Sequence, residues 1–511
     1  AAVMELTPLE EEAVLLSIDV ESPMTIRHVF IEGPTLRTRT SVIERQLQTA
    51  YGARTFAGVY TALHDAERRF KGMGVFKSLS IACVPAQNGG RDEVDLVITA
   101  EEKSAAAGGL GVHTDPDHGQ ATLSLNGKLR SPLGFGTLIE GSVDRKGRAV
   151  SDAFSIEIAK HHAFASETAA SIGLRSGTVN CRSEASYDLK SSAVTARVAT
   201  VDRRHALSYT CVARQIIAAE HSELSELRPA SARVLDEMGL PSLKSALAYT
   251  LRLDTRNDAM LPTAGSLLQL ETEFAGTGGD ARFLQTTLDA ALHVPLGLGG
   301  AVFALRARAT GVLHQADATS RSIADRVYLG GINSLRGFTA RGVGGECQPN
   351  GDSVSAIGGG WEREPLRVFV LCLADPPRSH THSCSCFFVL LFLGLFLLFF
   401  FQFDRLGGDL AANATAMVHF PLPLPLLRDI GMRGCFHAGG GSLVDIGRTG
   451  TPVDALRGSF SSLASSMRYS AGLGILAATP FGRVDVSYAY FIKSLAGDVA
   501  KRWQFGVSAG D

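Results

Sequence analysis

The chain has 511 residues, with 49 Lys and Arg against 51 Asp and Glu, so its formal net charge is −2. This balance provides no overall basic field and argues against a nucleic-acid partner. The 54 glycines follow no three-residue period and the eight cysteines are scattered, which excludes collagen-like and disulfide-stapled folds. The first twenty residues are acidic before they are apolar, which argues against a signal for ordinary bacterial export.

A small α/β domain is predicted over residues 24–103, after an N-terminal extension of residues 1–23. Apolar residues alternate in its strands and recur with helical spacing between them. The expected elements are a strand, two helices and two strands, at 24–32, 39–50, 59–70, 76–84 and 93–102. This order predicts two helices packed on a short sheet.

From residue 104 to residue 511 the helical period gives way to short alternating segments. Tyr249, Leu251 and Leu253 alternate with polar neighbours, and the same pattern recurs over 484–490. A soluble sandwich produces this alternation too, because one face of each strand packs a core. A region of about 400 residues is too long for one sandwich, however, and fits a membrane barrel with apolar-out, polar-in strands.

Three motifs in this region bear on the family. They are DTRNDAMLPTAG at 254–265, LGGINSLRGF at 329–338 and DRLGGD at 404–409. Together they resemble the outer-membrane barrel-assembly superfamily, which contains bacterial BamA. The positions that carry the resemblance are Asp254, Arg256, Pro262, Gly265, Leu329, Gly330, Gly331, Arg336, Gly337, Phe338, Asp404, Gly407 and Gly408.

The N-terminal domain resembles a POTRA domain, the polypeptide-transport-associated module. Val29–Gly33 in the first strand, Thr38 before the first helix and Gly74–Phe76 before the second strand carry this match. The resemblance implies an all-β transmembrane barrel of roughly sixteen antiparallel strands, with one small α/β POTRA domain in front. A single POTRA domain fits the branch of the superfamily that serves the mitochondrial sorting and assembly machinery.

The family resemblance also implies a function. Members of this branch insert β-barrel precursors into the mitochondrial outer membrane by templating the client's edge at the seam between their first and last strands. We expect these strands within 105–115 and 501–510. The implied partners are unfolded precursors, the lipid bilayer and metaxin-like accessory subunits, with the POTRA domain in the intermembrane space. The alternatives are a plastid-type polypeptide translocation pore and a passive porin.

The RGF tip is expected to have a structural role rather than a catalytic one. In the family it ends a long loop that folds into the barrel, where Arg336 would bind lumen carboxylates, Gly337 would permit a tight turn and Phe338 would pack on the wall. We therefore predict that these three residues form a latch on the seam. The sequence contains no nucleophile elbow, zinc-protease pair or P-loop, so we expect no enzyme activity, cofactor or metal.

Residues 368–402 break the pattern around them. The apolar run at 387–401 is short for a transmembrane helix, and the His and Cys residues at 380–386 are spaced too tightly for a structural zinc site. Phe, Leu, Ser and Cys are encoded by T-rich codons, so we interpret the block as a translated polypyrimidine tract, a retained intron. Its removal joins residue 367 to residue 403 and restores the strand that comes next in the family, to which we expect DRLGGD at 404–409 to belong.

Overall fold

The structure is a computed structural model. It describes residues 22–32, 35–86, 90, 92–114, 121–146, 151–163, 168–181, 185–218, 230–297, 299–314, 322–344, 346–347, 404–422, 431–446, 461–479, 482–495 and 497–508. The anomalous block 368–402, for which we considered an intron, a helix and a metal site, lies outside the described residues. Within them, every helix is too short or too polar to cross a bilayer.

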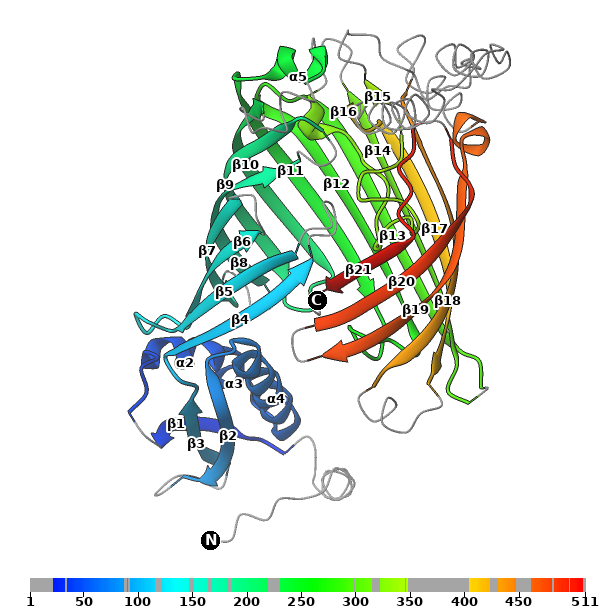
Figure 1. Cartoon of the computed structure of the whole chain (residues 1–511). Helices are drawn as coiled ribbons and strands as arrows, with labels where there is room; N and C mark the ends of the chain where they lie inside the picture. Colours follow the sequence, from blue (N-terminus) through cyan, green and yellow to red (C-terminus); the bar gives the residue numbers. More distant parts are fainter. Residues whose placement is uncertain are drawn as a thin grey trace, which may run out of the picture.

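The N-terminal part forms a small α/β unit beneath a large barrel (Figure 1). Its elements are β1 (Thr25–Glu32), α2 (Thr40–Gln46), α3 (Gln48–Tyr51), α4 (Phe56–Gly72), β2 (Phe76–Pro85) and β3 (Glu93–Glu102). The sheet order is β1-β3-β2, with β1 parallel and β2 antiparallel to β3. The predicted strands are present, whereas the first predicted helix is divided at Leu47 into α2 and α3.

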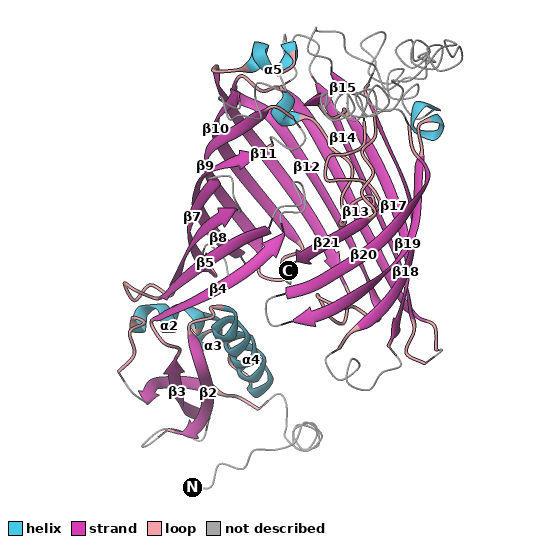
Figure 2. Cartoon of the chain, viewed as in Figure 1, coloured by secondary structure: helices cyan, strands magenta, loops and turns pink. Residues whose placement is uncertain are grey.

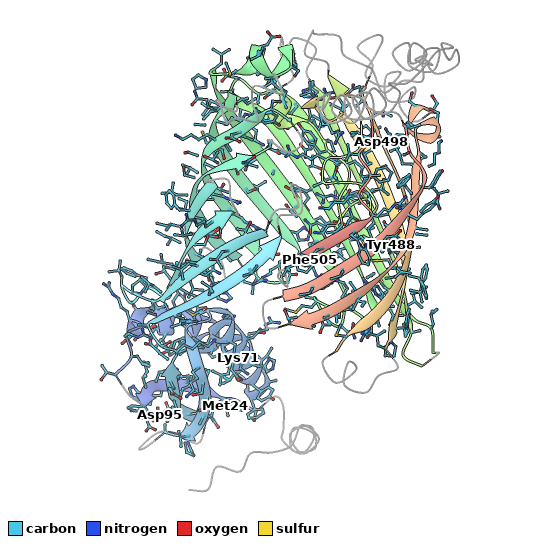
Figure 3. The ribbon with its side chains drawn as sticks, in the orientation of Figure 1. Met24, Lys71, Asp95, Tyr488, Asp498 and Phe505 are labelled. Atoms are coloured by element: carbon cyan, nitrogen blue, oxygen red, sulfur yellow. The ribbon has the colours of Figure 1, made fainter. Side chains whose placement is uncertain are left out.

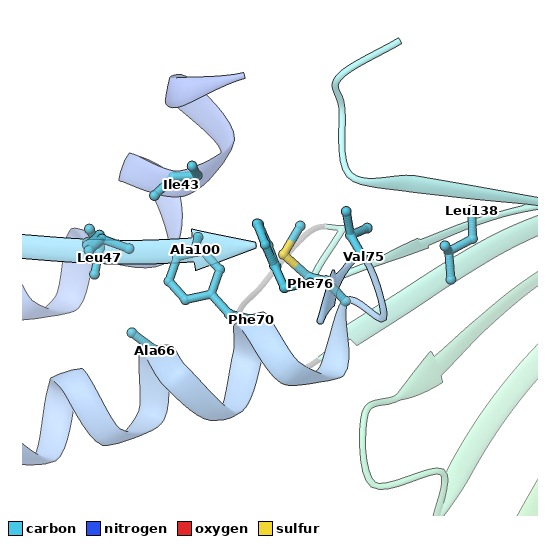
Figure 4. Packing of buried hydrophobic residues seen from close by; sticks show 10 residues of the cluster. Ile43, Leu47, Ala66, Phe70, Val75, Phe76, Ala100 and Leu138 are labelled. Carbon is cyan, nitrogen blue, oxygen red and sulfur yellow. The ribbon is translucent and has the colours of Figure 1, made fainter. Parts of the chain in front are cut away.

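The core of this unit lies between α4 and the sheet. Val59, Ala66 and Phe70 are buried on one side of α4, as the helical spacing predicts. Phe70 packs edge to face against Phe76 of β2, with ring centroids 5.7 Å apart. Leu138 belongs to the barrel but joins the same cluster, and it lies on the barrel side of the packed residues (Figure 4). The barrel therefore completes the core of the N-terminal unit.

The remainder forms one sheet of sixteen strands. The strands lie in the sheet in the order in which they follow in the chain, and adjacent strands are antiparallel. The strands are β4 (Ala106–Thr114), β5 (Ala121–Arg130), β6 (Thr137–Lys146), β7 (Ser151–His161), β8 (Thr168–Asn180), β9 (Tyr187–Thr200), β10 (His205–Ala218), β11 (Pro241–Asp254), β12 (Gly265–Gly279), β13 (Phe283–Pro295), β14 (Val302–His314), β17 (Leu410–Pro421), β18 (Arg433–Val444), β19 (Arg468–Thr479), β20 (Gly482–Lys493) and β21 (Trp503–Ser508). Figure 2 shows these strands wrapping into a barrel. The predicted fold class is confirmed.

The alternation read from the sequence distinguishes the two faces of the wall. Tyr249 and Leu253 of β11 are exposed, 41% and 42%, on the outer face. On β20 the polar or small Asp485, Ser487 and Ala489 are buried instead. An outer belt of large apolar side chains suits hydrocarbon, where a closed barrel also satisfies its backbone groups.

Two expectations for the barrel region need correction. It contains a short helix, α5 (Ala232–Glu237), between β10 and β11, although no helical period was expected there. The segment 404–409 was expected to belong to the next wall strand, but β17 begins only at Leu410. Asp404 and Arg405 form β16, which pairs with β15 (Glu346–Cys347). The chain therefore contacts the segment that follows β14 before it enters the wall as β17.

A buried carboxylate lies where the N-terminal unit meets the barrel. The Glu102 carboxylate accepts hydrogen bonds from Thr38 N (2.8 Å), Thr38 Oγ1 (2.6 Å), Arg37 N (3.1 Å) and Arg37 Nε (2.8 Å). Burial raises the pKa of Glu102, but these hydrogen bonds outweigh burial and hold the pKa below its ordinary value. Thr38 Oγ1 also lies 3.4 Å from Ser131 Oγ in the turn between β5 and β6.

The β5–β6 turn makes further contacts with the N-terminal unit. The Arg39 N–H donates to the carbonyl of Gly134 at 2.9 Å. The Arg39 guanidinium lies over the ring of Phe135, 4.1 Å from its centroid. These contacts, together with the buried Leu138, attach the N-terminal unit to the wall close to β4.

Candidate functional site

The two ends of the sheet meet at a seam between β4 and β21. These strands approach one another, yet no ladder pairing between them occurs within the described residues. Their positions, Ala106–Thr114 and Trp503–Ser508, fall inside the ranges predicted for the first and last strands. β21 has six residues, half the length of β20. Among the described residues, the sheet therefore has its two ends at this seam.

Residues 322–344 and 346–347, which we call the inward loop, follow β14 in the chain and include β15. It begins with a 3-10 turn at Ile323–Asp325, where the Asp325 carboxylate forms a buried ion pair with Arg214 of β10. The Glu237 carboxylate accepts from the Ile323 N–H at 2.9 Å. The beginning of the loop is thus fixed to β10 and to Glu237 of α5. In the strand order of the sheet, β10 is far from both seam strands, β4 and β21.

The Arg336 side chain reaches the inner wall near the seam. It binds Asp485 of β20 through two hydrogen bonds, from Nη1 to Oδ1 at 3.2 Å and from Nη2 to Oδ2. Both side chains are nearly inaccessible, 4% and 6% exposed. Arg483 donates to the same carboxylate at 3.2 Å, so two guanidiniums share one acid. A planar, bidentate pair fixes orientation as well as charge.

Gly337 lies at a close approach between the loop and the wall. Its φ is +89°, and a Cβ there would lie 3.2 Å from the Cβ of Ser470 and 3.4 Å from that of Ala489. Its N–H donates to Gln504 Oε1 at 3.0 Å, while Gln504 Nε2 donates to the carbonyl of Phe338 at 2.6 Å. One amide side chain of β21 therefore binds the loop backbone on both sides of this peptide.

The Phe338 side chain is fully buried among apolar residues of the loop and the wall. Its cluster includes Leu329 and Leu335 from the loop and Leu443 from β18. The Phe338 carbonyl also accepts from the Gly331 N–H at 3.1 Å. Leu329 and Val343 pair across the base of the loop, so the LGG and RGF segments close one compact turn.

The glycines of the LGG segment have the conformations that this turn requires. Gly330 and Gly331 have φ values of +122° and +103°. A Cβ on Gly330 would lie 2.3 Å from the carbonyl oxygen of Thr339. A larger residue at this position would separate the two arms of the loop and shift Phe338 from its pocket.

The D-x-R motif forms a turn of its own between β11 and β12. The Asp254 carboxylate accepts from Arg256 Nε at 2.9 Å and Arg256 Nη2 at 2.8 Å. Pro262 is buried, and Gly265 has a φ of +102° with no room for a side chain beside the backbone of Thr255. This motif shapes a hairpin end and is separate in the chain from the RGF tip.

The DRLGGD motif supports the base of the inward loop. Gly408 and Val327 exchange two backbone hydrogen bonds of 2.8 Å. Gly407 turns the chain with a φ of +69°, and Asp404 pairs through its backbone with Cys347. The structure therefore gathers LGG, RGF and DRLGGD around one loop.

Comparison with known proteins agrees with this geometry. The Omp85 superfamily domain matches residues 133–509. The chain belongs to the Omp85 superfamily. It is 24% identical to a SAM50-like protein of Schizosaccharomyces pombe over 502 residues, which cover 95% of this chain and 90% of the relative. It is 25% identical to the human sorting and assembly machinery component 50 homolog over 351 residues, 68% of this chain and 71% of the relative.

Two solved structures show the same fold. BamA from Haemophilus ducreyi lacking POTRA domains 1–3 superposes with a TM-score of 0.67 at 17% identity, covering 95% of this chain and 84% of that one. CdiB from Acinetobacter baumannii gives a TM-score of 0.52 at 12% identity, with coverage of 95% and 73%. The resemblance to the superfamily that contains BamA, and to its sorting and assembly machinery branch, is confirmed.

Sequence reasoning did not identify the partners of the RGF tip. Asp485 and Gln504 bind it from β20 and β21, and Asp498 anchors the segment between those strands through a buried ion pair with Arg468. The sequence signal that could have found Asp485 and Gln504 was their position in the alternation of outward and inward side chains. Asp485 and Gln504 occupy inward positions between large outward residues, where a buried polar side chain needs a partner.

Proposed function

We propose that this Omp85 protein assembles β-barrel precursor proteins into the mitochondrial outer membrane. The observation that carries the proposal is a sixteen-stranded sheet whose end strands, β4 and β21, approach without a described ladder while the inward loop holds β21 from inside. The similarity to SAM50 proteins and to BamA supports a role in barrel assembly. The client in this proposal is an unfolded precursor that adds its strand edge at the seam.

The mechanism needs no covalent chemistry. Each unpaired backbone group in hydrocarbon costs several kcal/mol, which is the barrier to inserting single strands. A seam that exposes backbone groups in the membrane lets an incoming strand satisfy its edge before its own barrel closes. Closure of the client then supplies the free energy, so we infer a non-enzymatic protein without cofactor or metal.

We further propose that residues 24–103 are a POTRA domain in the intermembrane space. The β1-β3-β2 sheet leaves β1 and β2 as edges, and an edge strand can bind extended client segments through its backbone. The contacts of Thr38, Arg39 and Leu138 would hold these edges at a fixed position below the seam. In this arrangement metaxin-like accessory subunits are the expected partners on the membrane.

The RGF tip would act as the latch of the seam. Arg336, Gly337 and Phe338 contact β20, β21 and the segment between them, and therefore hold the last strand rather than the first. The inward loop also occupies the lumen with buried apolar side chains, which argues against a passive porin. A translocation pore of the same superfamily remains the rival function.

Depletion of the protein from mitochondria tests the proposal. We expect assembly of newly imported mitochondrial porin to fall severalfold, while its translocation to a protease-protected site continues. Re-expression of the wild-type chain should restore assembly, whereas a chain lacking 24–102 should restore it slowly and remain membrane-embedded. Unchanged porin assembly after depletion would refute the assembly function, and loss of import before assembly would favour the pore.

A further inference from the structure

The turn between β5 and β6, residues 131–136, lies at the rim of the barrel nearest the N-terminal unit, which we call the lower rim (Figure 1). Its Leu133 side chain is 69% exposed, and Phe135 is 39% exposed. In the part of the chain that the structure describes, no large apolar side chain is more exposed than Leu133. An apolar tip of this kind marks a surface that contacts something other than water.

The turn continues the apolar outer surface of the two strands that it joins. The outward positions of β5 are leucines and one glycine, and Leu125 and Leu129 are 59% and 45% exposed. Val143 of β6 is 53% exposed on the same face. Because this face of the wall meets the hydrocarbon of the bilayer, the exposed turn lies at the end of a surface that already contacts lipid.

The shape of the turn does not require its apolar tip. The residues with positive φ are Ser131 (+49°), Gly134 (+78°) and Gly136 (+67°), so they supply the backbone conformations of the bend. The β9–β10 turn, at the same rim, is polar instead, and its Asp202 and Arg204 form an exposed ion pair. Leu133 therefore serves neither the fold of the turn nor a core.

Two arginines of the N-terminal unit reach the lower rim beside this turn. The Arg39 guanidinium lies over the Phe135 ring, and Arg45 of α2 donates from Nη2 to the Ala163 carbonyl at 3.5 Å. Both arginines are exposed. Apolar side chains with guanidiniums next to them are typical of a surface that binds the headgroup region of an anionic bilayer.

We propose that the β5–β6 turn and the start of α2 form an interfacial anchor on an anionic phospholipid bilayer. Leu133 and Phe135 enter the boundary between headgroups and acyl chains, and Arg39 and Arg45 bind lipid phosphates. The continuity with the lipid-facing wall and the charge of the guanidiniums identify lipid as the occupant. The anchor would hold the N-terminal unit against the membrane in one orientation.

Depth-dependent fluorescence quenching tests the anchor in the full chain. Leu133→Cys, Arg204→Cys and Val84→Cys are labelled with an environment-sensitive fluorophore in a chain whose exposed Cys83 is replaced by Ser. The same chain without an added cysteine measures the remaining background. The Arg204 side chain is a matched control because it is 65% exposed at the same rim.

Val84 is the control for an exposed apolar residue away from the barrel. It is 41% exposed and pairs with Asp95, which lies with Met24 on the side of the N-terminal unit away from the barrel, whereas Lys71 lies toward it (Figure 3). The labelled chains are inserted into vesicles of phosphatidylcholine, alone or mixed with phosphatidylglycerol. Quenching by headgroup-level spin-labelled lipid and by aqueous iodide is then compared, after heat-dependent gel migration has shown that each barrel is folded.

We expect spin-labelled lipid to quench the probe at position 133 severalfold more than the probes at 204 and 84, and iodide to quench it severalfold less. Phosphatidylglycerol should increase the lipid quenching at 133, and high salt should remove the increase. Arg39→Gln/Arg45→Gln in the Leu133→Cys chain should abolish this increase, whereas Arg39→Lys/Arg45→Lys, which keeps both charges, should retain it.

Equal quenching at all three positions in both kinds of vesicle would overturn the anchor. An increase with phosphatidylglycerol that survives Arg39→Gln/Arg45→Gln would overturn the role of the two arginines. A probe at 133 that iodide reaches in vesicles but not in mitochondria would show that a protein covers the turn, and would overturn lipid as the occupant.

Discussion

The ion pair between Arg336 and Asp485 should contribute measurably to the stability of the barrel. Removing one partner of a buried ion pair costs about 3–5 kcal/mol, because the other charge is left in a poorly solvated site. In Arg336→Ala the carboxylate keeps Arg483 at 3.2 Å, so we expect a loss near the lower limit, about 3 kcal/mol. Asp485→Asn leaves two guanidiniums without their acid and should lose about 5 kcal/mol.

The control is Arg308→Ala, which removes an exposed arginine that also faces the lumen from β14. Water can replace its contacts, so we expect a change within about 0.5 kcal/mol. The free energy of unfolding is measured by denaturant titration of the full chain in lipid, and client assembly is measured at equal protein levels in mitochondria. If Arg336→Ala and Arg308→Ala show equal stability and equal assembly rates, the latch has no special role.

Three further predictions concern other parts of the chain. Gly337→Ala should destabilise the barrel by about 1–3 kcal/mol, because Gly337 has a positive φ and lies against the wall. Heat stability measures this loss. The control is Gly239→Ala, where a Cβ would meet no atom within 4 Å, so we expect a smaller loss of stability. Because the folded-state pKa of Glu102 is lowered, its stabilisation of the junction is present above about pH 4.3 and is lost as the pH falls through that lowered pKa. Amide exchange at Thr38 should follow this dependence, and Glu102→Gln should abolish it. Sequencing of cDNA should find a main transcript without codons 368–402, and peptides from that block in purified membranes would contradict the intron interpretation.

The sequence determined the local structure and the family. A period of two assigns each side chain of a strand to one face of the sheet, so the outer positions of Tyr249 and Leu253 followed directly from the pattern. The order of the N-terminal elements followed from helical and strand periods in the same way. The LGGINSLRGF motif indicated an inward loop, because Gly330 and Gly337 allow turns that other residues resist.

The contacts of the loop were decided by the tertiary structure. Arg336 and Asp485 are 149 residues apart, and Gly337 and Gln504 are 167 apart. Periodicity shows that such residues face inward, but which of them meet depends on strand register, on the tilt of the wall and on how the sheet closes. The backbone hydrogen bonds between 497–502 and the inward loop depend on a buried acid, Asp498, whose partner is fixed only when β19 and the loop are in place. Local sequence specifies faces and turns, whereas the seam is a product of long-range closure.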